Sequence, residues 1–151
     1  MTKFAVLYVE PSDTQRETIQ LAGFNTELGK TYFDLTMPFG EIQFDRAVQF
    51  DLYKPAAVLD VPDIEDTFGE LQNLDAGWNE NEAIDCLTAF PRSMSTGDIV
   101  VNLETREIFY CASIGFKPVT GEPETLARLD AIGKAAQFEH LHRRASTELR
   151  K

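Results

Sequence analysis

The pattern of hydrophobic and polar positions predicts five strands. These runs are rich in β-branched and aromatic residues, and they lie at 3–9, 31–40, 56–61, 98–103 and 107–116. The second run is broken by Pro38 and Gly40, which predicts a strand with a bend. The last two runs are separated by a charged turn, so they predict a C-terminal hairpin over about 98–117.

Apolar residues at helical spacing predict helices between these strands. A short helix begins near Phe44 and is stopped by Pro55, and another begins at the capping residue Asp63 and is closed by Gly77. The segment after the first strand is ambiguous because it holds few apolar residues, although 12–15 fits a capping box.

A long helical extension is predicted over 122–150, with Pro123 in its first turn. Its apolar stripe changes phase along the helix. The first half places Leu126, Leu129, Ile132 and Ala136 on one face, and the second half places Phe138, Leu141, Ala145 and Leu149 on nearly the opposite face. The helix is therefore expected to be either long or broken at Gly133, with part of it packed on a partner.

The order of these elements predicts an α+β fold with a mostly antiparallel sheet and packed helices. A chain of 151 residues, 43% of them hydrophobic, is near the usual size of one domain and needs neither disulfides nor a metal to build a core. We expect a single globular domain over 1–151.

The net charge of −11 is unevenly distributed. The window 55–91 contains no Lys or Arg and nine acids, whereas the segment from Arg128 onward is mildly basic. The acidic window disfavours binding to nucleic acid and either mimics a phosphate track toward a protein partner or maintains solubility. The N-terminal run is too short for a secretory signal and no stretch reaches membrane-spanning length, which predicts a cytoplasmic protein with reduced thiols.

Residues that could carry catalysis or bind a metal are sparse, and no metal, cofactor or catalytic residue is predicted. His140 and His142 lie about 200° apart on a helix, which predicts a solvated helix end rather than a metal site. Cys111 lies within a strand among aromatic residues and is expected to be a small buried hydrophobe, while Cys86 follows an acid that would raise a thiol pKa. The acids near Trp78 are expected to be solvated.

The loop before the hairpin, RSMSTGD at 92–98, is the strongest candidate for a site. One glycine without a lysine is far from a phosphate-binding P-loop. The structural interpretation is a turn in which Gly97 supplies backbone freedom and Asp98 accepts hydrogen bonds from nearby amides. The alternative is a ligand pocket, whose candidate residues are Arg92, Ser93, Ser95, Asp98, Trp78 and Tyr110.

The two segments RSMSTGDIVV and REIFYCASIGFKPV resemble the YodL-like domain, a small domain of phage, plasmid and other mobile-element proteins. The matching positions are Ser93, Met94, Ser95, Gly97, Asp98, Ile99 and Val100, followed by Phe109, Tyr110, Gly115, Phe116 and Val119. IEDTFGELQN at 64–73 resembles an upstream helix of that family. The resemblance covers about a third of the chain well, transfers no catalytic residue, and implies an accessory protein in a bacterial cytoplasm.

Two functional hypotheses follow. The first is a non-enzymatic accessory protein that binds a host protein, for example in a defence system, or a second copy of itself through the C-terminal helix. Its candidate contact residues are Asp63, Glu65, Asp66, Glu70, Phe138 and Leu141. The second is a small-ligand or nucleotide-binding domain, enzymatic or not, that uses a pocket beside the 92–98 loop.

Overall fold

In a computed structural model, residues 1–37 and 41–149 are described, and they are built around a six-stranded antiparallel sheet. The strands lie in the order β3-β2-β1-β4-β5-β6. Their bounds are β1 (Thr2–Val9), β2 (Tyr53–Val61), β3 (Ile84–Cys86), β4 (Ile99–Asn102), β5 (Ile108–Cys111) and β6 (Phe116–Pro118). Every neighbouring pair is antiparallel, which confirms the α+β prediction.

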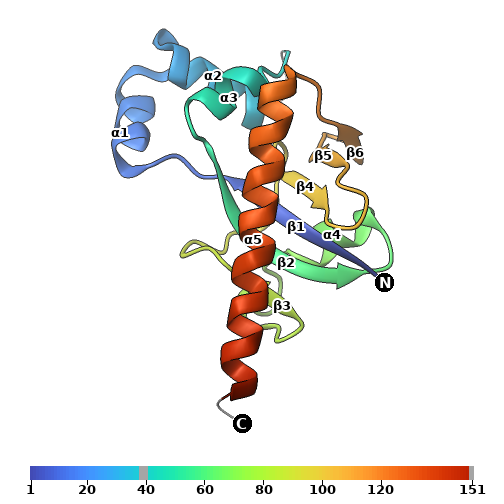
Figure 1. The fold of residues 1–151 in the computed structure, drawn as a ribbon. Helices are drawn as coiled ribbons and strands as arrows, with labels where there is room; N and C mark the ends of the chain where they lie inside the picture. Colours follow the sequence, from blue (N-terminus) through green and yellow to red (C-terminus); the bar gives the residue numbers. More distant parts are fainter. Residues whose placement is uncertain (38–40, 150–151) are drawn as a thin grey trace.

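Helices cover both faces of this sheet. Their bounds are α1 (Asp13–Ala22), η1 (Gly23–Asn25), α2 (Glu27–Thr36), α3 (Phe44–Gln49), α4 (Ile64–Glu70), η2 (Trp78–Glu80) and α5 (Pro123–Leu149). Figure 1 shows α5 crossing the front of the sheet, with α1, α2 and α3 gathered at its N-terminal end and α4 behind the sheet.

The core has two halves because β1 and its neighbours are buried on both faces. On β1, Ala5, Leu7 and Val9 pack under α5 and the N-terminal helices. Phe4, Val6 and Tyr8 pack on the opposite side against Leu71, Trp78 and Met94. A strand buried on both faces has no solvent-facing positions where polar residues could alternate with apolar ones, which explains the continuous apolar run at 3–9. Each fully buried Val, Leu or Phe side chain among them contributes about 1.5–3 kcal/mol of transfer free energy.

The predicted strand at 31–40 is wrong, because residues 27–36 form helix α2. Thr26 caps this helix by accepting a hydrogen bond from the Gly29 amide at 3.0 Å. Leu28, Thr31 and Leu35 recur at helical spacing and are buried. The loose alternation of apolar and polar residues at 31–36 is therefore part of a helical pattern. Residues 38–40, which were expected to bend the strand, lie outside the described part of the chain.

Three predicted boundaries are also corrected. The helix α3 ends at Gln49, after which Asp51 takes a φ of 56° and β2 begins before Pro55. The helix α4 ends at Glu70, not at Gly77. The predicted strand 107–116 is two strands, because the chain turns between Cys111 and Phe116 and returns as β6 beside β5.

Helix α5 is continuous through Gly133, so of the two expected forms, a long helix or a broken one, the structure has the long helix. Gly133 serves close packing instead, because a Cβ there would lie 3.2 Å from the Val101 side chain on β4. The predicted capping box at the start of α1 is confirmed, because Ser12 and Gln15 exchange hydrogen bonds. Asp63 is the N-cap residue of α4, as predicted, and its amide also donates to Asp66 Oδ2 at 3.0 Å.

Candidate functional site

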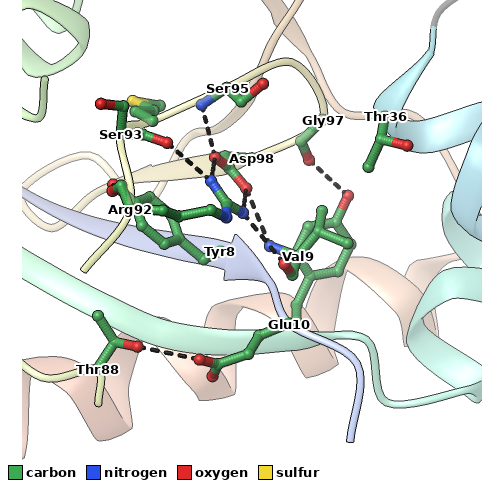
Figure 2. Close-up of polar contacts among 12 residues, drawn as sticks. Tyr8, Val9, Glu10, Thr36, Thr88, Arg92, Ser93, Ser95, Gly97 and Asp98 are labelled. Atoms are coloured by element: carbon green, nitrogen blue, oxygen red, sulfur yellow. Dashed lines mark hydrogen bonds and ion pairs between the residues drawn. The ribbon is translucent and has the colours of Figure 1, made fainter. Parts of the chain in front are cut away.

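Asp98 is fully buried at the centre of the 92–98 loop, and both of its carboxylate oxygens are satisfied (Figure 2). Oδ1 accepts a hydrogen bond from the Val9 amide at 2.9 Å and one from Arg92 Nη2 at 2.8 Å. Oδ2 accepts one from the Ser95 amide and one from Arg92 Nη1, both at 2.8 Å. The predicted hydrogen bonding of Asp98 to nearby amides is confirmed, and Arg92 adds a bidentate ion pair.

The Arg92 guanidinium also contacts other groups around the 92–98 loop. Besides the carboxylate, it donates to the Val9 carbonyl at 3.1 Å and to the Ser93 carbonyl at 3.0 Å. It also lies 4.1 Å from the centre of the Tyr8 ring, a cation–π contact. The Arg92 carbonyl in turn accepts from the Tyr8 hydroxyl at 2.9 Å and from the Trp78 indole at 2.7 Å. These contacts hold the loop against the end of β1.

Burial dominates the electrostatics of this cluster. Loss of hydration raises the pKa of Asp98, and the ion pair with Arg92 opposes that rise. The Tyr53 hydroxyl donates to the Gly97 carbonyl at 2.8 Å, and burial, together with the Asp98 charge, raises the pKa of Tyr53 well above its usual value. Asp98 is therefore a buried structural carboxylate rather than an exposed general base.

Gly97 confirms the predicted need for backbone freedom in this loop. Its φ is 93°, and a Cβ there would lie 2.5 Å from the Leu35 carbonyl oxygen on α2. Only glycine combines this conformation with such a close approach.

The structure brings five of the six predicted ligand-binding residues together. Arg92, Ser93, Ser95 and Asp98 share the loop, and Trp78 joins it through the indole bond. Tyr110 does not, because its ring packs 5.1 Å from that of Phe44 in the core half beneath α5. In the described part of the chain, every buried side-chain polar atom has a hydrogen-bond partner, so the cluster leaves no buried polar group for a ligand.

A groove of about 610 Å³ opens beside the loop, where β1 ends and α1 begins. Its lining includes Arg92, Arg16, Tyr32 and Phe90. The sequence pointed to the loop but not to Arg16 or Tyr32, because their proximity depends on how α1 and α2 pack.

The predicted acidic contact residues lie on the far side of the sheet from α5. Asp63, Glu65, Asp66 and Glu70 are all exposed on or next to α4. Two of the four also cap the helix, which accounts for part of the acid surplus. None of the four forms an ion pair with a described residue. By contrast, Asp85 is paired with α5.

His140 corrects the prediction of a solvated helix end. It is buried, with Nδ1 3.0 Å from Asp85 Oδ2 and Nε2 3.5 Å from Lys3 Nζ. His142, on the other side of the helix, is exposed and stacks on Phe138. Arg143 adds a hydrogen bond to the Cys86 carbonyl at 2.7 Å. These contacts tie α5 to the edge strand β3.

The remaining candidates for chemistry are the cysteines and the possible metal ligands. Burial raises the pKa of the Cys111 thiol to about 11, as expected for an inert buried cysteine. Within residues 1–37 and 41–149, no group of His, Cys, Asp and Glu is arranged to hold a metal ion. Across the same residues, none of the helices combines the length and apolar character needed to cross a bilayer.

Comparison with known proteins adds no assignment. No protein-family model, no curated protein and no solved structure matches the chain. The resemblance to the YodL-like domain therefore stays a prediction.

Proposed function

We propose that this protein acts by binding another protein rather than by catalysing a reaction. The observation that carries the proposal is the outer face of α5. Phe138 is 73% exposed and Leu141 is 55% exposed on a helix whose opposite face is already buried against the sheet. A surface helix normally presents polar residues to water, so two large apolar side chains exposed one turn apart on α5 indicate a second packing partner.

The acidic residues around α4 support the same class of function. They lie behind the sheet, away from α5, so they form a second surface. The exposed side chains of Phe68 and Leu74 lie on and just after α4, which gives this surface an apolar component. Such a mixture fits a partner with a basic and partly apolar surface. On the YodL-like resemblance, we further propose that this activity belongs to a phage or plasmid accessory protein of the bacterial cytoplasm, directed for example at a host defence protein.

The test uses the full chain as bait in bacterial lysate, followed by purification of each captured protein and measurement of its dissociation constant. Two variants show which of the two surfaces, α5 or the acidic residues around α4, binds the partner. Phe138→Glu changes α5, and Glu65→Gln combined with Glu70→Gln changes the acidic surface while leaving the Asp63–Asp66 capping box intact. A purified partner whose binding weakens at least tenfold with one variant supports the proposal. If neither variant weakens any binding, and the chain does not bind itself, the proposal is wrong.

The groove beside Arg92 favours a second candidate function, the binding of a small ligand. The Arg16 guanidinium is exposed at this groove, with Nε bonded to the Pro11 carbonyl at 3.2 Å, and the Phe90 ring is 63% exposed. The groove is also lined by Glu10 and Asp13, so its charge is mixed. Its aromatic rings and Arg16 suit a planar ligand, such as a nucleotide, whose anionic group contacts Arg16. Thermal shifts with a nucleotide panel, compared between wild type and Arg16→Ala, test this candidate, and the absence of any shift in the wild type refutes it.

A further inference from the structure

The buried imidazole of His140 on α5 contacts an acid on one strand and a cation on another. Its side chain is only 8% exposed. Nδ1 lies 3.0 Å from Asp85 Oδ2 on β3, and Nε2 lies 3.5 Å from Lys3 Nζ on β1. Figure 1 shows the C-terminal part of α5 passing beside β3. The ring therefore ties this part of the helix to two strands, through one nitrogen each.

The two contacts together determine where the ring carries its proton. A carboxylate only accepts hydrogen bonds, and an ammonium group only donates them. Nδ1 must therefore donate its proton to Asp85, whereas Nε2 must accept a hydrogen bond from Lys3. Only a neutral imidazole with its proton on Nδ1 meets both requirements. A neutral imidazole in water prefers its proton on Nε2, so the two neighbours impose the less common tautomer on His140.

We propose that Lys3, His140 and Asp85 form a pH-sensitive latch between β1, α5 and β3, which is closed while the imidazole is neutral. When the ring takes up a proton, Nε2 becomes a donor and no longer accepts from Lys3. The two positive charges then repel each other, while the attraction of the ring to Asp85 increases. The Lys3 ammonium has a second acid nearby, because Asp60 Oδ2 on β2 lies 4.0 Å from it. Protonation of His140 thus transfers Lys3 from α5 to β2.

Other charged side chains face this latch from each element that packs around it. They are Arg143, Arg144 and Glu139 on α5, Glu82 before β3 and Asp60 on β2. The acids favour a proton on the imidazole and the arginines oppose it. Carboxyl and guanidinium groups ordinarily titrate outside the range from about pH 5 to about pH 8, whereas histidine titrates within it. The ring also lines a groove of about 580 Å³, through which a proton reaches it without unfolding.

The latch lies next to the exposed apolar side chains of the proposed binding surface. Phe138 and Leu141 flank His140 along α5. With a neutral ring, the helix at this point is tied to both β1 and β3, and with a protonated ring it is tied to β3 alone. The inference does not rest on the proposed function, because it concerns contacts within the chain.

Long-range proton–nitrogen NMR spectra of the imidazole rings in the wild-type protein test the closed state. At about pH 8, His140 is expected to carry its proton on Nδ1. His142 is the internal control, because it is exposed and stacks on Phe138, and its proton is expected on Nε2. A neutral His140 with its proton on Nε2 overturns the inference, since that nitrogen could not then accept from Lys3.

Lys3→Met tests the pH dependence, because it keeps the length of the side chain and removes the ammonium group. At about pH 8 the urea midpoint is expected to fall, since a hydrogen bond to the ring is lost. At about pH 5.5 this loss should shrink or reverse, because the ammonium group then opposes the charged ring. Without Lys3 the native state binds the proton more readily while the unfolded chain does not, so the variant gains relative stability as pH falls.

The control is the same Lys3→Met change in a His140→Gln background, where no group at position 140 titrates. There the effect of Lys3→Met should be equal at the two pH values, and any contribution from Asp60 is present in both backgrounds. A loss in the wild-type background that is the same at both pH values overturns the inference. So does a pH dependence that is identical in the two backgrounds.

Discussion

The ion pair between Arg92 and Asp98 offers the sharpest test of what holds the 92–98 loop. The informative change is Arg92→Met, which keeps the length of the side chain over the Tyr8 ring and removes the guanidinium. Two charge-assisted hydrogen bonds to Asp98 are lost, along with the bonds to the Val9 and Ser93 carbonyls. The carboxylate of Asp98 then stays buried with only the Val9 and Ser95 amides as donors.

The expected cost follows from the exposure of the two partners. Removing one member of a fully buried pair costs about 3–5 kcal/mol, because it strands the other charge. The Asp98 side chain is 0% exposed, but that of Arg92 is 41% exposed, so solvent already screens part of the interaction. We therefore expect a loss of about 3 kcal/mol near neutral pH, at the lower end of that range.

The stability lost on Arg92→Met should depend on pH, and the burial of Asp98 determines the direction of that dependence. Burial raises the folded-state pKa of Asp98 above the unfolded value, so the native state binds a proton more readily than the unfolded chain does. Its contribution to stability therefore improves as pH falls through the folded pKa. Without Arg92 that pKa rises further, and protonation relieves the stranded charge. The destabilisation of Arg92→Met should shrink as pH falls from about 8 to about 5.

Urea unfolding at several pH values measures this difference, with the free energy of unfolding as the readout. The control is Arg92→Met in an Asp98→Asn background, where no carboxyl remains at position 98 and the effect of the arginine should not change with pH. An equal loss for Arg92→Met at both ends of the pH range would show that Asp98 is not the group that titrates.

Three further changes test other parts of the structure. Gly97→Ala should destabilise the fold by more than about 1 kcal/mol, because the residue has a φ of 93° and its Cβ would lie 2.5 Å from the Leu35 carbonyl oxygen; an unchanged urea midpoint would contradict this. Gly69→Ala should raise the unfolding free energy by about 0.5–1 kcal/mol through helix propensity, since a Cβ there meets nothing within 4 Å in α4; a lower melting temperature would count against it. The Cys111 thiol, with its pKa of about 11, should resist alkylation at pH 8 in the folded protein and react only after unfolding, as mass spectrometry of labelled peptides can show.

Predictions that depended on local hydrogen bonding were confirmed. The capping box at Ser12 and the N-cap at Asp63 form as predicted, because all of their partners lie within three residues. The same holds for Gly97 and for the bond from the Ser95 amide to Asp98. The hairpin of β4 and β5 also followed from its own pattern and turn. In each case the physical cause is contained in a short stretch of chain.

Predictions that required a distant partner failed or stayed incomplete. Residues 31–36 look like a strand in isolation and become the second half of α2, where Leu28 and Leu35 bury one face of the helix. Gly133 looks like a helix break and instead lets α5 approach Val101. His140 looks solvated until Asp85 and Lys3 are brought beside it.

The sequence by itself therefore determined the class of fold, the hairpin, the helix caps and the turn that Asp98 supports. Only the tertiary structure decided that Asp98 pairs with Arg92 against the end of β1, that one histidine is buried while the other is exposed, and that α5 is one continuous helix through Gly133. The reason is range: caps and turns are satisfied within a few residues, whereas burial and charge pairing depend on segments up to 137 residues apart, as for Lys3 and His140.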